Sequence, residues 1–336
     1  MDRRNLIGLG IAAGAVAAAG VARGDTPTTT DLPGDPRETI ALWRGVPPGG
    51  EGVKLKLNLF ERSPAPLVYR DRAATDIAEP IITVFRGEKP DGSALLIAPG
   101  GGYQRVVVDK EGFDPAHVLA KAGVTVFVLR YRLPFEGWAD RADVPLQDAQ
   151  RAMRLIKSRA SALGIDVARL GVLGFSAGGH VAASLATRFD AKVYAPRDAD
   201  DGLSARPAFA VFLYPVVSMT PPLAHAGSRT KLLGDNSTSA QDAANSCERL
   251  VSAATPPSWL ALAGDDKEVD PQNSFGLFSA LRAAKVPGEM HVFEEGGHGF
   301  GIHLAEGKPA SAWPKLFLRW GAKHGFFKNI KIQGAT

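Results

Sequence analysis

The sequence predicts an α/β fold with one mostly parallel central sheet and helices packed on both of its faces. Short apolar runs alternate with longer segments in which apolar residues recur at helical spacing. Such alternation is typical of parallel sheets, because parallel neighbours are joined by long, usually helical, crossovers. The 336 residues are 45% hydrophobic and 22% charged, which is ordinary for a globular protein with one large core.

The strand patterns are short apolar runs bounded by polar, glycine or proline residues. The first, 53–59, alternates polar and apolar residues, which predicts a half-exposed edge strand. The other expected strands are 79–85, 94–98, 124–129, 170–174, 208–213, 258–263 and 289–293. Helices are expected at 115–122, 144–163, 177–187, 271–284 and 309–324. In the clearest of them, 144–163, one face carries Leu146, Ala149, Met153 and Ile156, and Gly164 ends the helix.

The first residues, 1–24, predict a signal peptide. Arg3 and Arg4 precede a short apolar stretch from Leu6 to Ala19, and small residues follow it. The arginine pair fits either twin-arginine export or a Sec signal. The stretch is shorter than the roughly 20 apolar residues of a membrane span. We therefore expect export to the periplasm or beyond, with no stable membrane insertion after processing.

The rest of the chain divides into an arm and one domain. Residues 25–52 are rich in Pro, Gly and Thr, which predicts a linker or an irregular arm on the surface. Residues 53–330 carry all the strand and helix patterns. Within them, the long connection at about 215–257 predicts either a functional insertion over the site or a surface insertion with a short helix.

Charge and cysteine content exclude several classes of function. The net charge is only +4, and the basic residues are scattered and not interleaved with aromatic ones, so nucleic acid is not an expected partner. The single cysteine, Cys247, rules out an intramolecular disulfide and lies far from the predicted strand ends. No His-x-x-x-His or Glu-rich cluster appears, so we expect neither a metal nor a cofactor. Nothing in the sequence sets the oligomeric state.

Residues 174–178, Gly-Phe-Ser-Ala-Gly, are the strongest functional signal. They join a predicted strand to an alanine-rich predicted helix, and the glycines two residues either side of Ser176 permit a strained turn. Such a turn lifts the Ser176 hydroxyl above the sheet edge at a helix N-terminus, where negative charge is favoured. The same spacing also occurs in plain glycine-rich turns, but the flanking patterns favour a nucleophilic serine.

A nucleophilic serine needs a base and an acid that orients the base. His298 is the predicted base, because it lies between glycines on a loop that follows the strand 289–293. Histidines in predicted helices or strands are expected to be structural: His117, His180, His291 and His324.

The acid is expected in the acidic cluster that follows the strand 258–263. Carboxylates directly after a parallel strand lie at the carboxyl edge of the sheet, where open α/β sheets place their sites. Asp266 is the predicted acid and Asp265 the second choice. Asp270, directly before Pro271, is the expected N-cap of the following helix.

Donors for an oxyanion are expected in the glycine run 100–102, which follows the strand 94–98. Glycines let backbone N–H groups approach a substrate without interference from Cβ atoms. The predicted donors are the N–H groups of Gly101 or Gly102 together with that of Ala177. The run matches neither a phosphate loop nor a dinucleotide fingerprint, because it lacks a following Gly-Lys-Ser/Thr and the Gly-x-Gly-x-x-Gly spacing.

Together these segments resemble the α/β-hydrolase superfamily, and in detail its bacterial carbohydrate-esterase branch of acetylxylan- and feruloyl-esterase-like proteins. The similar stretches, from about residue 80 to about 325, are 98–103, 110–112, 128–134, 174–180, 225–229, 232–234, 265–266, 273–274 and 296–300. In that family the glycine run forms the oxyanion loop, and the acid lies three residues before a Val-Pro pair. Asp266 lies three residues before Val269, although Asp270 replaces the proline.

The resemblance implies a secreted serine esterase that removes acyl groups, first of all acetyl groups, from plant-polysaccharide fragments. The expected partner is thus an acylated carbohydrate. Tyr103 and Trp138 are candidates either for stacking on a sugar or phenolic ring or for core packing, and His225 is a candidate for the substrate pocket. The alternatives are a feruloyl esterase, a peptidase of the prolyl-oligopeptidase type, and an inactive hydrolase-fold binding protein.

Overall fold

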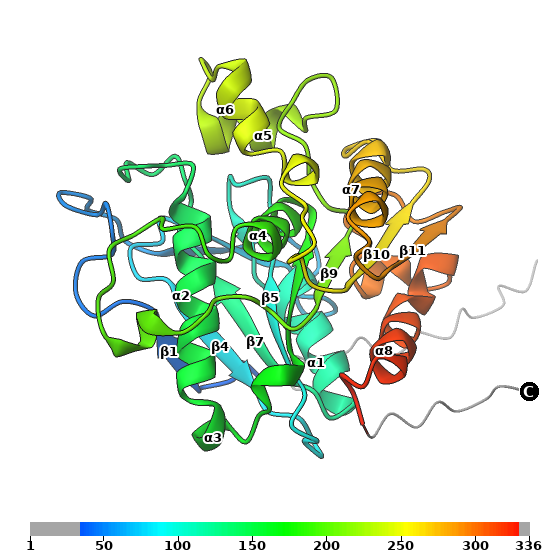
Figure 1. The fold of residues 1–336 in the computed structure, drawn as a ribbon. Helices are drawn as coiled ribbons and strands as arrows, with labels where there is room; N and C mark the ends of the chain where they lie inside the picture. The colour runs from blue at the N-terminus through cyan, green and yellow to red at the C-terminus, as the bar shows by residue number, and fades with distance from the viewer. Residues whose placement is uncertain (1–33, 329–336) are drawn as a thin grey trace, which may run out of the picture.

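The computed structural model describes residues 34–328, which form an eight-stranded sheet and a separate three-stranded sheet (Figure 1). The order of the large sheet is β1-β4-β7-β5-β8-β9-β10-β11. Strand β4 pairs antiparallel with β1 and β7, and every other neighbouring pair is parallel. The predicted α/β architecture with a mostly parallel sheet is confirmed.

The strands of the large sheet are β1 (Thr39–Ala41), β4 (Ile81–Phe85), β5 (Ala94–Ala98), β7 (Thr125–Arg130), β8 (Leu170–Phe175), β9 (Ala210–Leu213), β10 (Ser258–Ala263) and β11 (Gly288–Phe293). All but β1 form within two residues of the predicted ends. The small sheet contains β2 (Asn58–Glu61), β3 (Arg72–Thr75) and β6 (Val106–Val107). The central strands β5, β8, β9 and β10 are buried along their whole length, as expected for parallel strands that helices cover on both faces.

Helices cover the large sheet on both faces, and two separate buried cores result. One core contains residues of α2 (Val144–Ser158), α3 (Ala160–Leu163), α4 (Ser176–Thr187) and α7 (Gln272–Ala283). The other contains residues of α1 (Asp114–Lys121) and α8 (Trp313–Lys323).

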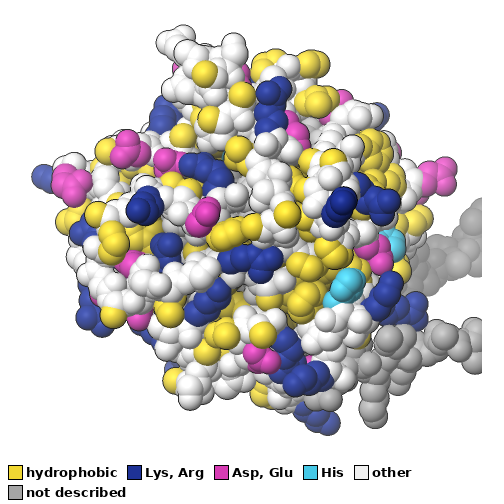
Figure 2. Space-filling view, viewed as in Figure 1, with side chains coloured by type: hydrophobic (Ala, Val, Ile, Leu, Met, Phe, Trp, Pro, Cys, Tyr) yellow, Lys and Arg dark blue, Asp and Glu magenta, His cyan; other side chains and the backbone are white. Residues whose placement is uncertain are grey.

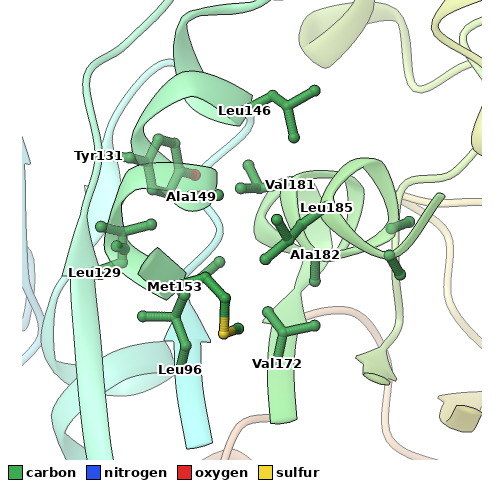
Figure 3. Close-up of a cluster of buried hydrophobic side chains, with 14 of the residues drawn as sticks. Leu96, Leu129, Tyr131, Leu146, Ala149, Met153, Val172, Val181, Ala182 and Leu185 are labelled. Atoms are coloured by element: carbon green, nitrogen blue, oxygen red, sulfur yellow. The ribbon is translucent and has the colours of Figure 1, made fainter. Parts of the chain in front are cut away.

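The first core fixes the junction between β8 and α4. Figure 3 shows strand side chains meeting those of α2 and α4: Leu96, Leu129, Val172, Leu146, Met153, Val181 and Leu185. Each fully buried aliphatic side chain stabilises the fold by roughly 1.5–3 kcal/mol. Packed apolar contacts therefore hold both the strand before the β8–α4 turn and the helix after it.

The predicted edge strand 53–59 is wrong over most of its length. Residues 53–57 have no regular structure, and β2 begins only at Asn58. It pairs with β3 in the small sheet, outside the large one. Leu57 and Leu59 are both exposed, so the alternating pattern does not bury a face.

Two predicted helices are divided. Residues 144–163 form α2 and the one-turn α3, with Arg159 between them outside helical geometry (φ −101°, ψ 10°). Gly164 ends α3 in the left-handed conformation (φ 67°), as predicted. Residues 309–324 form a 3-10 turn (Pro309–Ala312) and α8, because Pro314 lacks the N–H that would continue one helix across this point.

The arm predicted at 25–52 is not an irregular surface segment throughout. Thr39–Ala41 forms β1, which adds an edge strand to the large sheet. Leu42 and Trp43 are buried, and the indole Nε1 of Trp43 donates to Asp148 Oδ1 at 2.8 Å. Ile40, Leu42 and Trp43 therefore belong to the core of the domain.

Between β9 and β10 the chain forms α5 (Ala226–Leu233), α6 (Ser239–Ala244) and a 3-10 turn (Cys247–Arg249). In Figure 1, α5 and α6 lie above the sheet at the top of the view.

The predicted signal peptide, 1–24, lies outside the described residues. Within residues 34–328, no helix is long and apolar enough to cross a membrane. On the face shown in Figure 2, Lys and Arg side chains are dispersed among acidic, apolar and uncharged ones.

Candidate active site

Ser176 lies at the turn between β8 and α4, in the middle of the large sheet. Its φ of 50° is in the left-handed region, which costs of order 1–3 kcal/mol for a non-glycine residue and persists only where the surroundings hold it. The flanking glycines make this turn possible. A Cβ on Gly174 would overlap the carbonyl oxygen of Gly178, and a Cβ on Gly178 would overlap that of Ala98.

The structure brings Ser176, His298 and Asp266 together in one hydrogen-bonded chain. Ser176 Oγ lies 2.8 Å from His298 Nε2, and His298 Nδ1 lies 2.8 Å from Asp266 Oδ2. An ionised carboxylate only accepts hydrogen bonds, so Nδ1 donates to Asp266 and Nε2 is left to accept from the serine hydroxyl. Asp266 Oδ1 also accepts the N–H groups of Glu268 and Val269, at 2.9 and 3.0 Å. These two bonds fix the carboxylate so that Oδ2 faces the imidazole.

Asp265, the second choice for the acid, is occupied elsewhere. Its Oδ1 accepts the backbone N–H groups of Gly296 and Gly297, at 3.0 and 2.7 Å. The hydrogen bond from Gly297 lowers the pKa of the Asp265 carboxyl. Asp265 therefore shapes the loop that carries His298, whereas Asp266 contacts the ring itself.

The glycine run lies directly beside the serine. A Cβ on Gly100 would lie only 2.8 Å from Ser176 Cβ, and Gly101 (φ 123°) and Gly102 (φ 66°) have dihedral angles that favour glycine. Within residues 34–328, the N–H groups of Gly101, Gly102 and Ala177 donate to no protein group. Unpaired backbone donors beside a nucleophile and at a helix N-terminus are suited to bind an anion.

A cavity of about 410 Å³ lies beside Asp266, and polar or charged side chains form much of its wall: His225, Lys267, Glu268 and Asp270. The N–H of Ser228 donates to His225 Nδ1 at 3.2 Å, so a neutral ring carries its proton on Nε2. Burial and the neighbouring His298 lower the pKa of His225, which favours this neutral form. His225 can thus donate a hydrogen bond.

In the described part of the chain, no cluster of three or more His, Cys, Asp or Glu could hold a metal.

Tyr103 and Trp138 do not reach a substrate; both pack in the core. Tyr103 is 1% exposed, and its hydroxyl lies 2.7 Å from His180 Nδ1. Trp138 is also buried, with the Arg132 guanidinium 4.8 Å from its ring centre. Cys247 is buried as well, and burial raises the pKa of its thiol to about 12, so it stays protonated.

Sequence reasoning assigned no role to Glu111 and Tyr214, which also lie at the site. Glu111 Oε2 accepts the N–H of Gly100 at 2.9 Å, and Tyr214 donates its hydroxyl to Glu111 Oε1 at 3.1 Å. The ring of Tyr214 packs 5.1 Å from that of His298. The only signal for Glu111 was its place within the resembling stretch 110–112, and nothing marked Tyr214.

A family model described as the alpha/beta hydrolase fold matches residues 96–302. The chain therefore belongs to the α/β-hydrolase family, as its sequence predicted.

Named relatives place it near the carbohydrate esterases. Endo-1,4-beta-xylanase B of Butyrivibrio fibrisolvens is 37% identical over 220 residues, which cover 65% of this chain and 34% of the relative. The acetylxylan esterase of Xylanibacter ruminicola is 32% identical over 224 residues, which cover 65% of this chain and 43% of the relative. The match thus spans less than half the length of either curated relative. A crystal structure of an acetyl ester-xyloside bifunctional hydrolase from Caldicellulosiruptor lactoaceticus aligns with a TM-score of 0.70 and 32% identity, over 90% of this chain and 99% of that one.

Proposed function

We propose that this protein is a serine esterase that removes acetyl groups from xylan-type carbohydrate esters. The observation that carries the proposal is the hydrogen-bonded chain from Ser176 through His298 to Asp266, beside unpaired backbone N–H groups. The likeness to an acetylxylan esterase and to an acetyl ester-xyloside hydrolase supports the acetyl group and the sugar.

In the first half of the reaction, Ser176 Oγ attacks the ester carbonyl carbon while His298 Nε2 takes the hydroxyl proton. The carbonyl π electrons move to its oxygen, and the N–H groups of Gly101 or Gly102 and of Ala177 stabilise the resulting anion. Asp266 stabilises the imidazolium that forms. The tetrahedral intermediate then breaks its bond to the sugar oxygen, which leaves with the proton from His298.

The second half releases the acyl group. Water attacks the acetyl carbon of the ester on Ser176 while His298 takes a proton from it. Collapse of the second tetrahedral intermediate breaks the bond to Ser176 Oγ, which regains a proton from His298, and acetate leaves. His298 thus acts in both halves, as base first and as acid second.

The cavity beside Asp266 is the proposed place of the leaving sugar. Its wall offers the Nε2–H donor of His225, the ammonium of Lys267 and the carboxylate of Glu268, which match the donors and acceptors of sugar hydroxyl groups. Its volume of about 410 Å³ is within the roughly 300–1,000 Å³ of small-molecule sites.

The test compares wild type with Ser176→Ala on three esters: 4-nitrophenyl acetate, acetylated xylo-oligosaccharides and methyl ferulate. We expect wild type to release acetate from the oligosaccharides far faster than it cleaves the ferulate, and the variant to be inactive on all three. Faster cleavage of the ferulate would show that the enzyme prefers cinnamoyl esters, and would contradict the proposed acetyl specificity. An inactive wild type would favour a binding protein, and an active variant would overturn the mechanism.

We also propose that the protein is exported. The support is the pattern at 1–24, in which Arg3 and Arg4 precede a short apolar stretch. Expression of the full chain followed by cell fractionation tests this. A shortened chain in the periplasm or medium is the expected result, and a full-length chain confined to the cytoplasm would contradict it.

A further inference from the structure

Glu111 is a buried carboxylate between the two loops that complete the site. It lies on a π-helical turn, Asp109–Phe113, and is 3% exposed. None of the ion pairs within residues 34–328 involves it; its partners are the N–H of Gly100 and the hydroxyl of Tyr214. Burying a carboxyl group is costly unless hydrogen bonds compensate, so the burial of Glu111 needs a reason beyond packing.

One oxygen of Glu111 holds the glycine run. Oε2 accepts the N–H of Gly100 at 2.9 Å, and a Cβ on Gly100 would lie 2.5 Å from this oxygen and 2.8 Å from Ser176 Cβ. Glu111 and Ser176 therefore confine Gly100 closely. This contact sets where the next two N–H groups, those of Gly101 and Gly102, point.

The other oxygen holds the loop of His298 through Tyr214. The Tyr214 hydroxyl donates to Glu111 Oε1 at 3.1 Å and accepts the N–H of Gly301 at 3.2 Å. Tyr214 adopts a left-handed φ of 36°, and its ring packs against those of His298 and Phe300, at 5.1 and 4.6 Å. A strained backbone conformation persists only where surrounding contacts stabilise it. The hydrogen bond from the Tyr214 hydroxyl to Glu111 is one of these contacts.

We propose that Glu111 is a positioning residue, which acts with Tyr214 to keep the oxyanion donors and His298 in one fixed geometry around Ser176. The inference rests on the proposed function, since it assigns these two loops their roles in ester cleavage. Catalytic groups must be held within about 0.5 Å of the productive geometry, and small displacements cost large factors in rate. A carboxylate suits this position because it can accept from both loops at once, through charge-assisted bonds.

The test uses Glu111→Gln and Tyr214→Phe, with Tyr194→Phe as the matched control. The side-chain amide keeps the size of Glu111 but has one oxygen, so one of the two loops loses its acceptor. Tyr194 also donates to a carboxylate, that of Asp201 at 2.7 Å, outside the site. Active enzyme is counted by labelling Ser176 with a fluorophosphonate, and kcat on 4-nitrophenyl acetate is given per labelled site.

We expect kcat per labelled site to fall roughly 10- to 100-fold in both site variants, with KM changed less than about threefold, because the lost contacts align the transition state and not the bound ester. The rate of labelling should fall in parallel. The double variant should be scarcely slower than Glu111→Gln alone, because the two residues act as one unit. Tyr194→Phe should keep kcat within about twofold of wild type.

A purely structural role gives a different result. It would lower the thermal midpoint and the fraction of labelled enzyme, but leave kcat per labelled site within about twofold of wild type, and this would overturn the inference. The proposed function fails separately: a wild type that cleaves 4-nitrophenyl acetate but spares acetylated xylo-oligosaccharides contradicts the substrate and leaves the positioning test intact. A wild type that neither reacts with the label nor cleaves any ester would overturn both.

Discussion

Two histidines in this molecule form chains of similar geometry and do different things. His298 lies 2.8 Å from the hydroxyl of Ser176 and 2.8 Å from a carboxylate oxygen of Asp266. His180 lies 2.7 Å from the hydroxyl of Tyr103 and 2.7 Å from the backbone oxygen of Asn245. In each case the ring bridges a hydroxyl group and an oxygen acceptor.

The difference lies in the acceptor and in burial. Asn245 offers a neutral carbonyl, and burial lowers the pKa of His180 to about 4, so this ring stays neutral. It links Tyr103, which follows the glycine run, to Asn245 at the C-terminal end of α6. Asp266 offers a negative charge, and the His298 side chain is 18% exposed. A hydroxyl–imidazole–oxygen chain can therefore act as a base only where a charge stabilises the imidazolium and a substrate can reach it.

The largest expected effect separates the two rings directly. His298→Asn should lower kcat/KM on 4-nitrophenyl acetate by at least about 10⁴-fold, because no base remains for Ser176. His180→Asn should lower it less than about tenfold and mainly reduce the thermal midpoint, since a buried hydrogen bond is lost. Steady-state kinetics and thermal unfolding of both variants check this. Equal losses of activity would contradict the distinction.

The next effect concerns the charged acceptor. Asp266→Asn should cost about 10⁴-fold in kcat, because the amide no longer stabilises the imidazolium and disfavours the required tautomer. Asp265→Asn is the control, since its bonds to Gly296 and Gly297 only shape the loop. Its cost should stay below about tenfold. The assignment of the acid would be reversed if Asp265→Asn proved the more damaging change.

The neutral ring should appear in the pH dependence of stability. His180 binds its proton only near pH 4 when folded but near pH 6.5 when unfolded, so between these values the unfolded state holds more protons. The contribution of His180 to the free energy of unfolding should therefore have its full value above about pH 6.5. It should fall by up to about 3 kcal/mol as the pH drops to about 4. Urea unfolding of wild type and His180→Asn across this range measures it. Identical slopes in the two proteins would show that His180 is not held neutral.

The smallest expected effect concerns a third histidine. His225→Ala removes a neutral donor from the cavity wall beside Asp266, so KM for acetylated xylo-oligosaccharides should rise about fivefold to tenfold, the cost of one lost hydrogen bond. KM for 4-nitrophenyl acetate should not change, because that ester brings no sugar. An equal change for both esters would place His225 outside the sugar site.

The reacting residues could be predicted from the sequence, because their order along the chain and their positions just after predicted strands identify them. Ser176, Asp266 and His298 each follow a strand of the parallel sheet, and such strand ends meet at one edge. The choice between Asp265 and Asp266 could not be made from position alone. It depends on which carboxylate receives the N–H groups of Glu268 and Val269, a matter of local loop geometry.

The burial of individual side chains and the backbone dihedral angles could not be predicted from the sequence. Tyr103 and Trp138 look like sugar platforms until the packing of His180 and Arg132 against them is known. Tyr214 carries no motif, because its part in the site depends on a left-handed φ. The alternation in 53–59 failed for a similar reason, since no packed layer covers Leu57 or Leu59.

The most direct test is to trap the acyl-enzyme. Wild-type enzyme is quenched with acid during turnover of 4-nitrophenyl acetate, and its intact mass and peptide map are measured. We expect one acetyl group, on Ser176. An active enzyme whose acetyl group lies on another residue would contradict the role of Ser176 as the nucleophile.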